Sequence, residues 1–457
     1  MERRGMYSWV VLAASFMTMM FGPSVSYAAG VFHVALLKEF DEDLVLTTWV
    51  GSIFGCMFAL AGPVASFVIN VFSCRTCVVM SGIVMLVGFA CSSLVTDIRL
   101  LFMTYALVAG LGTCLSGAGA IVVLGYYFPN NPAFAQGLCV AGAGLGMFVH
   151  PVLVQYLSDN YGFHGAFLIT GGLTSHACVT GMLMRPSVIE RKRKRDISGG
   201  GPLRRKILLL LCGDCSRTEK VVKNISFLLF AFSIFCFSLG SSAEYLFLPV
   251  FFMKQGATFR DVSLVISTSG IGSVISRILT GIASSEEKIG GAILHTSIAS
   301  IMALFTLFVP LFQSSSYLQI LLGFFLGLYT GGVWVLMNTL TLDILGLQNF
   351  ATGMGVVMLF CGTGHLIGPP IAGAILEATG DYYNVFLFSG AMMFLASALG
   401  FLSNPKENTR KCQLDTLTEL NMCTDNKSDE VAVTDAIENM LPTERKEREH
   451  QLLDESI

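Results

Sequence analysis

Two ionisable side chains, Glu244 and Arg277, stand deep inside long apolar stretches of this 457-residue chain. A charged group placed in lipid costs at least about 2.5 to 3.5 kcal/mol, so such residues usually face a polar cavity or a partner. A guanidinium stays charged and offers a planar fork of donors that matches the two oxygens of a carboxylate. Two uses of Arg277 therefore remain open: binding of a carboxylate, or an ion pair with Glu244 that fixes two helices together.

The elements that must hold these residues are membrane helices. The chain is 53% hydrophobic and only 13% charged, with a mean hydropathy of +0.68, whereas a soluble domain of this length needs far more charged surface. A spanning helix needs about 20 mostly apolar residues. Twelve such stretches are present, six before a polar central loop and six after it. The first begins near Tyr7 and lacks a small-residue cleavage site, so we expect a retained helix rather than a signal peptide.

Residues 133–172 and 351–390 repeat one pattern of small residues and proline at an offset of 218. The repeat indicates two related halves, the plan of many secondary transporters, although chance similarity between glycine-rich segments is the alternative. We therefore predict an all-α membrane protein of twelve helices in two six-helix bundles. The matched positions are Ala133 with Ala351, Gly137 with Gly355, Gly144 with Gly362, Gly146 with Gly364, Pro151 with Pro369, Gly162 with Gly380, and Gly172 with Gly390.

The predicted domains are an N-terminal bundle over 1–185, a basic loop over 186–223, a C-terminal bundle over 224–403 and a tail over 404–457. Of the 28 Lys and Arg residues, twelve fall in the central loop between Arg185 and Lys223. Because basic loops stay in the cytoplasm, we predict a multi-pass protein with both termini cytoplasmic. A polybasic run beside a helix end is typical of attraction to anionic lipid, so nucleic-acid binding is not expected. The tail has 7 basic and 13 acidic residues and is expected to be disordered.

Other chemistry finds little support in the sequence. Two Cys-x-x-Cys pairs, Cys74 with Cys77 and Cys212 with Cys215, are too far apart to predict a compact zinc site, and palmitoylation of the second pair is favoured over metal binding. The chain has no phosphate-binding glycine loop with Lys-Ser/Thr and no hydrolase constellation. We expect no enzyme activity, no metal and no cofactor.

The helical halves carry motifs of a known family. The stretches 342–346, 351–355, 368–373, 379–382 and 386–390 closely resemble the monocarboxylate transporter family of the major facilitator superfamily. Two signature regions also match, at Gly5 to Val11 and at Tyr127 to Gly146. The resemblance implies the major facilitator fold, in which two bundles rock about a central site and expose it alternately to either side.

The resemblance also assigns candidate substrate-binding residues. It implies that Arg277 is the helix 8 arginine that binds the substrate carboxylate. The positions of the aspartate and the lysine found in lactate-type members correspond to Ser273 and Tyr27, so the chain resembles a divergent member. Asn338 stands near a position at which the lactate carriers have a bulky aromatic residue. The polar residue here indicates either a roomier, more polar pocket or an interhelical hydrogen bond.

The usual proton acceptor is thus missing. A buried carboxyl takes up a proton more readily than an exposed one, which makes Glu244 a substitute, unless it simply faces the outer vestibule. Proton coupling, sodium coupling and uncoupled diffusion all remain open. His150 and His365 are interpreted as packing histidines rather than as proton relays.

We therefore predict a secondary active or facilitative transporter in the lipid bilayer that carries a small carboxylate-bearing solute, either a monocarboxylate or a related zwitterion. The alternative is a non-transporting receptor or scaffold of the same fold that signals through its acidic tail. The resemblance also implies a plasma-membrane location and a single-pass glycoprotein ancillary subunit.

Overall fold

A computed structural model describes residues 2–40, 44–129, 131–187, 190–191, 215–285, 290–312 and 315–403. The basic clusters at 192–195 and 204–206, Cys212 and the tail over 404–457 lie outside the described residues. All regular elements in the described ranges are helical. Those of the N-terminal half are α1 (Glu2–Phe21), η1 (Pro23–Ala28), α2 (Ala29–Phe40), α3 (Leu44–Leu60), α4 (Gly62–Val71), α5 (Cys74–Ser92), α6 (Ile98–Leu101), η2 (Phe102–Ala109), α7 (Gly110–Tyr127), α8 (Pro132–Thr174) and α9 (Ala177–Leu183).

The C-terminal half is also helical and consists of fewer, longer helices. Its elements are α12 (Cys215–Lys223), α13 (Ile225–Lys254), α14 (Phe259–Ala283), α15 (Gly291–Leu307), η3 (Val309–Phe312), α16 (Ser316–Thr379) and α17 (Tyr382–Leu402).

Two of the long helices fold back on themselves at a glycine. In α8 the backbone of Gly162 has φ 67°, and in α16 that of Gly346 has φ 69°. Glycine adopts such left-handed angles without steric cost. Gly380, the repeat partner of Gly162, also has a positive φ, 70° at the end of α16. The ψ angles of this pair differ, −175° at Gly162 and −1° at Gly380, so the two repeat partners share a positive φ but not one backbone conformation.

The twelve predicted spans are found in the structure when these reversals are counted. Among the described residues, eight helices are long and apolar enough to cross a bilayer, and the segments Trp49–Leu60 and Gly62–Val71, bent by 41°, make a ninth span. Because α8 and α16 each fold back, each supplies two crossings, and the seventeen-residue apolar helix α15 supplies one more. The described residues thus contain the twelve expected helical crossings.

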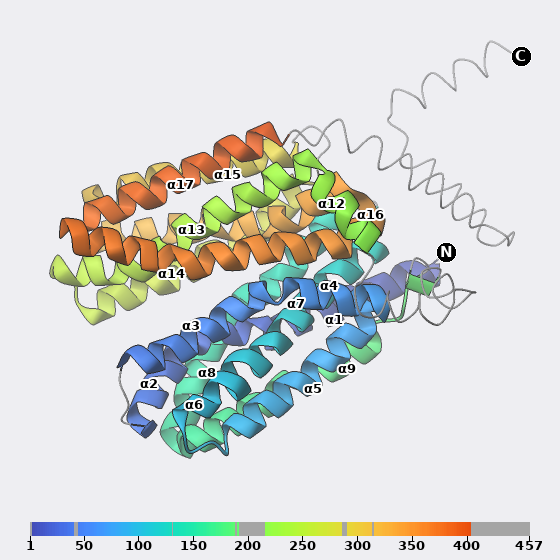
Figure 1. Cartoon of the computed structure of the whole chain (residues 1–457), viewed down its shortest axis with the longest axis horizontal. Coiled ribbons are helices and arrows are strands. Elements are labelled where there is room, and N and C mark those ends of the chain that lie inside the picture. The colour runs from blue at the N-terminus through green and yellow to red at the C-terminus, as the bar shows by residue number, and fades with distance from the viewer. Residues whose placement is uncertain are drawn as a thin grey trace, which may run out of the picture.

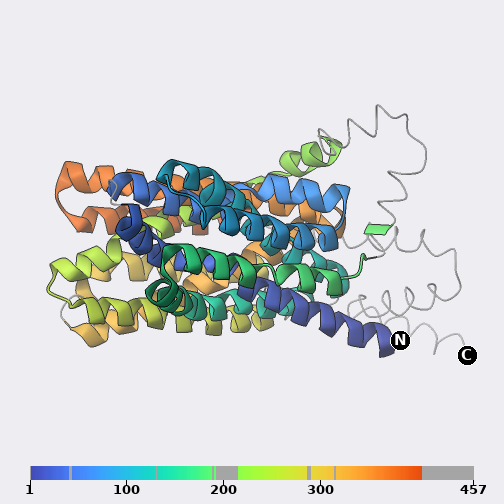
Figure 2. The ribbon, with the colours of Figure 1, turned by 90° about the horizontal axis from the view of Figure 1, so that it is seen from below.

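The two halves form separate bundles that lie side by side (Figure 1). The view from below shows the long helices of both bundles running in roughly the same direction (Figure 2). The N-terminus and α12 lie at one end, with α2 and α6 at the other (Figure 1). We call the first of these the basic end, because Arg185 and Lys223 lie there. The Tyr127 hydroxyl donates to the Arg185 carbonyl at 2.9 Å, which shows that α8 and α9 return the chain to the end where α7 finishes.

Glycines bring the two bundles into backbone contact near the basic end. A Cβ added at Gly137 of α8 would lie 2.7 Å from the Arg277 carbonyl oxygen and 2.8 Å from the Gly281 Cα of α14. A Cβ added at Gly62 of α4 would lie 2.7 Å from the Gly355 carbonyl oxygen of α16. Small residues let membrane helices approach this closely. These glycines therefore position the helices that line the space between the bundles.

Candidate functional site

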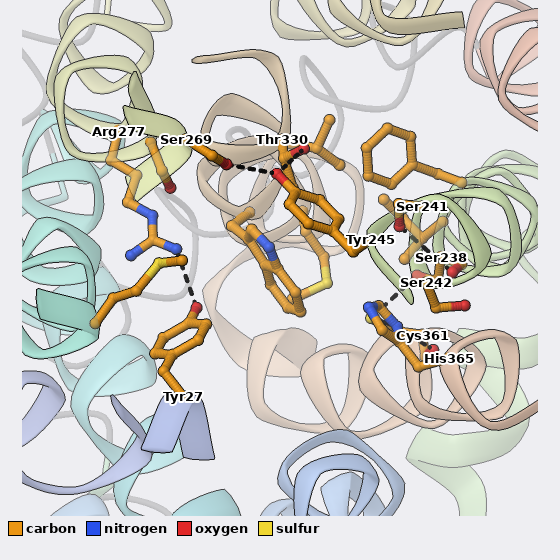
Figure 3. Close-up of a pocket in the computed structure, with 17 residues that line it drawn as sticks. Tyr27, Ser238, Ser241, Ser242, Tyr245, Ser269, Arg277, Thr330, Cys361 and His365 are labelled. Carbon is orange, nitrogen blue, oxygen red and sulfur yellow. Dashed lines mark hydrogen bonds between the residues drawn. The ribbon is translucent and has the colours of Figure 1, made fainter. Parts of the chain in front are cut away.

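A cavity of about 310 Å³ lies between the bundles, and most of its wall belongs to the C-terminal one. Figure 3 shows its side chains, which converge from several helices on one space. Tyr27 of η1 and Met147 of α8 are the contributions of the N-terminal bundle. The C-terminal bundle contributes Ile234, Phe237, Ser238, Ser241, Ser242, Tyr245, Ser269, Ser273, Arg277, Thr330, Val333, Trp334, Met337, Cys361 and His365.

Helical periodicity puts the polar lining residues on shared faces. On α13, Ser238, Ser241, Ser242 and Tyr245 follow one another at spacings of three, one and three, which places them on one side of a helix. On α14, Ser269, Ser273 and Arg277 recur every four residues. Each helix therefore turns one narrow polar stripe into the cavity and leaves its other faces to lipid or to packing.

Arg277 is the charged residue of the cavity. It is 2% exposed, so its guanidinium is withdrawn from solvent. Nη1 donates to the Val140 carbonyl of α8 at 3.1 Å, and Nη2 donates to the Tyr27 hydroxyl at 3.3 Å. Its Nε has no hydrogen-bond partner among the described residues. Because no Asp or Glu stands among the described residues that line the cavity, this wall carries uncompensated positive charge and can attract an anion.

A hydrogen-bonded group on the C-terminal side holds Tyr245 in place. Its hydroxyl lies 3.1 Å from the Ser269 hydroxyl and 3.2 Å from that of Thr330. These three residues come from α13, α14 and α16, so the group ties three helices together at the cavity wall (Figure 3). Tyr245 is 36% exposed and lines the cavity, so part of the residue is accessible to a ligand.

Trp334 and His365 form another part of the wall. Their ring centroids are 6.0 Å apart with planes at 35°. The His365 Nδ1 lies 3.0 Å from the Cys361 carbonyl oxygen, and the Ser238 hydroxyl donates to the Cys361 sulfur at 3.2 Å. Aromatic faces beside hydroxyl groups suit a ligand that is partly flat and partly polar.

The structure brings three of the five predicted site residues together. Arg277, Ser273 and Tyr27 all line the cavity, and Arg277 contacts Tyr27 directly. Glu244 and Asn338 do not line it. The ion pair considered for Arg277 and Glu244 is not formed in the described structure. Arg277 donates to Val140 and Tyr27, whereas Glu244 accepts from Thr306.

Glu244 lies instead within the C-terminal bundle and is fully buried. The Thr306 hydroxyl of α15 donates to its Oε1 at 2.9 Å, while its Oε2 has no hydrogen-bond partner among the described residues. The same hydroxyl lies 3.6 Å from the Met393 sulfur of α17. Glu244 therefore joins α13 to α15 at a packed interface and does not face an open vestibule. Asn338 is 1% exposed and its Oδ1 likewise has no described partner.

The two histidines have different surroundings. His150 is buried against η1, with its Nδ1 3.0 Å from the Gly146 carbonyl oxygen and 3.3 Å from the Ser24 hydroxyl. These contacts suit a packing role. His365, by contrast, lines the cavity.

Sequence reasoning missed the hydroxyl stripe of α13 and the group around Tyr245. A usable signal was present, because Ser238, Ser241, Ser242 and Tyr245 are polar residues at helical spacing in an otherwise apolar stretch. Trp334 carried no comparable signal, since an aromatic residue in a membrane helix is as compatible with lipid as with a cavity. In the part of the chain that the structure describes, no three His, Cys, Asp or Glu side chains gather as metal ligands would.

Comparisons with known proteins agree with this architecture. A family model described as the Major Facilitator Superfamily matches residues 8–360 and again 293–417. Monocarboxylate transporter 12 of Xenopus laevis is 29% identical over 414 residues, which cover 86% of this chain and 88% of that protein. Monocarboxylate transporter 6 of Mus musculus is 27% identical over 418 residues, 89% of each chain.

Two solved structures share the fold. The proton:xylose symporter XylE, bound to 6-bromo-6-deoxy-D-glucose, aligns with a TM-score of 0.65 at 12% identity and covers 87% of this chain and 94% of its own. The E. coli fucose:proton symporter FucP aligns with a TM-score of 0.62 at 13% identity, over 86% of this chain and 99% of its own. At these identities the likeness concerns the fold alone.

Proposed function

Because the chain belongs to the Major Facilitator Superfamily and is a member of its monocarboxylate transporter family, we propose that it moves a small monocarboxylate across a membrane by alternating access. Membership in this family confirms the expectation of a transporter rather than an enzyme. The observation that carries the substrate class is the position of Arg277, the charged residue of the cavity between the bundles.

The geometry of Arg277 suits a carboxylate. Its Nη1 is anchored to the Val140 carbonyl, which holds the guanidinium plane in position. Nε has no described partner, and Nη2 has only the Tyr27 hydroxyl. Nε and one terminal nitrogen share an edge of the guanidinium fork, and such an edge binds both oxygens of a carboxylate. We assign this edge and the Tyr27 hydroxyl to the substrate carboxylate, with Ser273 one turn from Arg277 on the same face of α14.

The cavity favours a monocarboxylate over a zwitterion. A zwitterion brings an ammonium group that needs an opposite charge or several acceptors once water is removed. The part of the cavity wall that the structure describes contains no carboxylate, so an ammonium would have no counter-charge there, while Arg277 satisfies a single anion.

Substrate binding at Arg277 can also change how the two bundles are arranged. Arg277 belongs to α14 of the C-terminal bundle, and its partners Val140 and Tyr27 belong to the N-terminal bundle. A carboxylate that takes up Nη2 competes with Tyr27 and weakens one link between the bundles. A ligand that interacts differently with two conformations shifts their populations. Arg277 can therefore connect occupancy of the site with rocking of the bundles.

For energy coupling, we assign the proton-binding role to Glu244. Its Oε2 is buried without a hydrogen-bond partner, and no basic side chain pairs with the carboxyl group, among the residues that the structure describes. An unpaired buried carboxylate costs several kcal/mol, a cost that a bound proton removes. The next residue, Tyr245, lines the cavity, so movement of α13 affects both positions. We expect the response of uptake to an inward proton gradient to be lost in Glu244→Gln and retained in the exposed-residue control Glu377→Gln. An equally strong response in Glu244→Gln contradicts this role and leaves sodium coupling or uncoupled transport.

Orientation and location belong to the same proposal. The excess of Lys and Arg in the loop between the bundles supports a cytoplasmic position for the basic end and both termini. We place the protein in the plasma membrane with a single-pass glycoprotein partner. Labelling of cysteines introduced into the 192–214 loop, in intact and in permeabilised cells, tests the orientation.

The central experiment measures monocarboxylate flux in proteoliposomes. Removing a hydrogen-bonded charge costs about 1.5 to 3 kcal/mol, so we expect Arg277→Ala to lower uptake about 10-fold or more. Arg277→Lys should restore little of the lost uptake, because an ammonium lacks the planar fork of donors. The exposed Arg99→Ala is the matched control and should transport normally. Absence of flux in every form, the native protein included, would instead favour the receptor alternative.

A further inference from the structure

We propose that Ser241 and Ser242 of α13, together with Ser238 and His365, form a second subsite that accepts hydrogen bonds from the far end of the substrate. The preferred substrates are then monocarboxylates with an uncharged O–H or N–H donor at the end opposite the carboxylate. This inference rests on the proposed function and adds a second point of recognition to it.

The two subsites lie on opposite sides of one cavity. Figure 3 shows Arg277 and Tyr27 on one side, and Ser238, Ser241, Ser242, Cys361 and His365 on the other. Tyr245 lies between them. A cavity of about 310 Å³ is at the lower end of the range of pockets that hold drug-sized ligands. A substrate of a few carbon atoms bound at Arg277 would therefore leave the hydroxyl side unfilled.

The hydroxyl groups face the cavity mainly as acceptors. The Ser241 hydroxyl donates to the Ser238 carbonyl at 3.4 Å, and the Ser242 hydroxyl donates to the Leu239 carbonyl at 3.2 Å. Ser238 donates to the Cys361 sulfur. A serine has one donor and two acceptor lone pairs, so each of these oxygens retains acceptor capacity. The complementary ligand group is a donor.

His365 adds to the acceptor character of this side. Its Nδ1 lies 3.0 Å from the Cys361 carbonyl oxygen, and a carbonyl only accepts, so Nδ1 carries the hydrogen. In the neutral ring the other nitrogen, Nε2, is then an acceptor. Because the described lining residues include no carboxylate, this side offers acceptors without negative charge, which suits a neutral donor better than an ammonium.

The space between the subsites is lined by flat side chains. Trp334 stands beside His365, and Tyr245 is fixed by Ser269 and Thr330. Aromatic side chains pack well against a planar group. A hydroxylated aromatic acid thus has a partner for each of its parts: Arg277 for the carboxylate, the rings for its plane and the serines for its hydroxyl.

Two acids that differ in one hydroxyl group test the inference, namely 4-hydroxyphenylacetate and phenylacetate. We expect the native protein in proteoliposomes to prefer the hydroxylated acid on the order of fivefold, as one added hydrogen bond implies. In the double variant Ser241→Ala and Ser242→Ala, the uptake ratio of the hydroxylated acid to phenylacetate should fall to near one. Continued uptake of phenylacetate shows that this variant is folded. Ser226→Ala, on the same helix but away from the cavity, is the matched control and should keep the preference.

The outcomes separate the two proposals. Uptake of both acids that depends on Arg277, with no preference in the native protein or with a preference unchanged in the double variant, overturns the second subsite and leaves the proposed function intact. If the native protein takes up neither acid nor any other monocarboxylate, the proposed function fails and the second subsite fails with it. If the double variant loses phenylacetate uptake, the single variants Ser241→Ala and Ser242→Ala decide by the same ratio.

Discussion

The Arg277 Nη2 donates a hydrogen bond to the Tyr27 hydroxyl at 3.3 Å and so joins the C-terminal bundle to the N-terminal bundle at the cavity. The two residues are 250 positions apart in the chain. Tyr27 stands on the short helix η1, where the chain passes from α1 to α2, and Arg277 stands on α14. The bond links the side chain proposed to bind the substrate with the boundary that moves in the proposed alternating-access cycle.

Tyr27→Phe tests this link. Hydrogen bonds to charged groups contribute about 1.5 to 3 kcal/mol, and Tyr27 also orients the guanidinium, so we expect the apparent affinity for monocarboxylate to fall about 10-fold or more. If Tyr27 acts through Arg277, the change has little further effect in the Arg277→Ala background, which a double-mutant cycle of uptake kinetics measures. Tyr317→Phe, at a side chain that is 85% exposed, is the control. Additive losses in the cycle would assign Tyr27 an independent role.

Gly137→Ala tests the close approach of α8 and α14. The added Cβ would lie 2.7 Å from the Arg277 carbonyl oxygen, so the two backbones must separate or the helices must shift. We expect a clear loss of transport rate at equal surface expression. Gly172→Ala on the same element meets nothing within 4 Å and should have little effect on rate. Equal rates in the two variants would show that this contact is not needed during the transport cycle.

Cross-linking α4 to α16 should stop transport. The Asn70 Nδ2 donates to the Thr352 Oγ1 at 3.0 Å, between the bundles near the basic end. In a variant with Asn70→Cys and Thr352→Cys, a short bifunctional thiol reagent should join the helices and abolish uptake, because the bundles can no longer separate there. Each single cysteine variant, treated in the same way, controls for the native thiols. A cross-linked protein that still transports would contradict rocking at this end.

Glu190 provides a test of stability. Its carboxylate accepts hydrogen bonds from the backbone N–H of Cys74 and from that of Ser187, each at 2.6 Å, and the residue is 5% exposed. A buried carboxylate at the start of α5 caps the helix and complements its dipole. We expect Glu190→Ala to lower stability by about 2 to 4 kcal/mol, seen as a lower melting temperature of the purified protein in detergent. The exposed Glu219→Ala should leave the melting temperature nearly unchanged, since surface ion pairs contribute little.

Much of the fold could be predicted from the sequence because the membrane restricts the choices. Apolar stretches of sufficient length must be helices, and the 218-residue offset indicated the two halves. The hairpin reversal inside α16 at Gly346 was not predicted as such, because sequence patterns alone do not give the backbone angle at one glycine.

The candidate site could be predicted in part. Arg277 stood out because a charge within an apolar stretch is costly, and Ser273 came from the resemblance to lactate-type members, in which an aspartate takes its place. Glu244 met the same criterion, yet it lies inside the C-terminal bundle with Thr306. The free-energy cost of placing a charge in lipid indicates that an ionisable residue is buried away from lipid. It does not show whether a cavity or a packed interface surrounds that residue.

The sequence by itself determined a membrane protein of twelve helical spans in two related halves, with an arginine inside an apolar stretch of the second half, because hydropathy, repeat spacing and the cost of a buried charge are properties of the chain alone. The transporter function was indicated by the resemblance of its motifs to a known family. Only the tertiary structure decided which polar groups share the cavity. Tyr27, Arg277, Trp334 and the α13 serines come from segments far apart in sequence, and their convergence depends on the close approach of helices at the glycine contacts. Helix rotation and packing, which the linear pattern specifies only through the complete fold, place Arg277 in the cavity and Glu244 behind its wall.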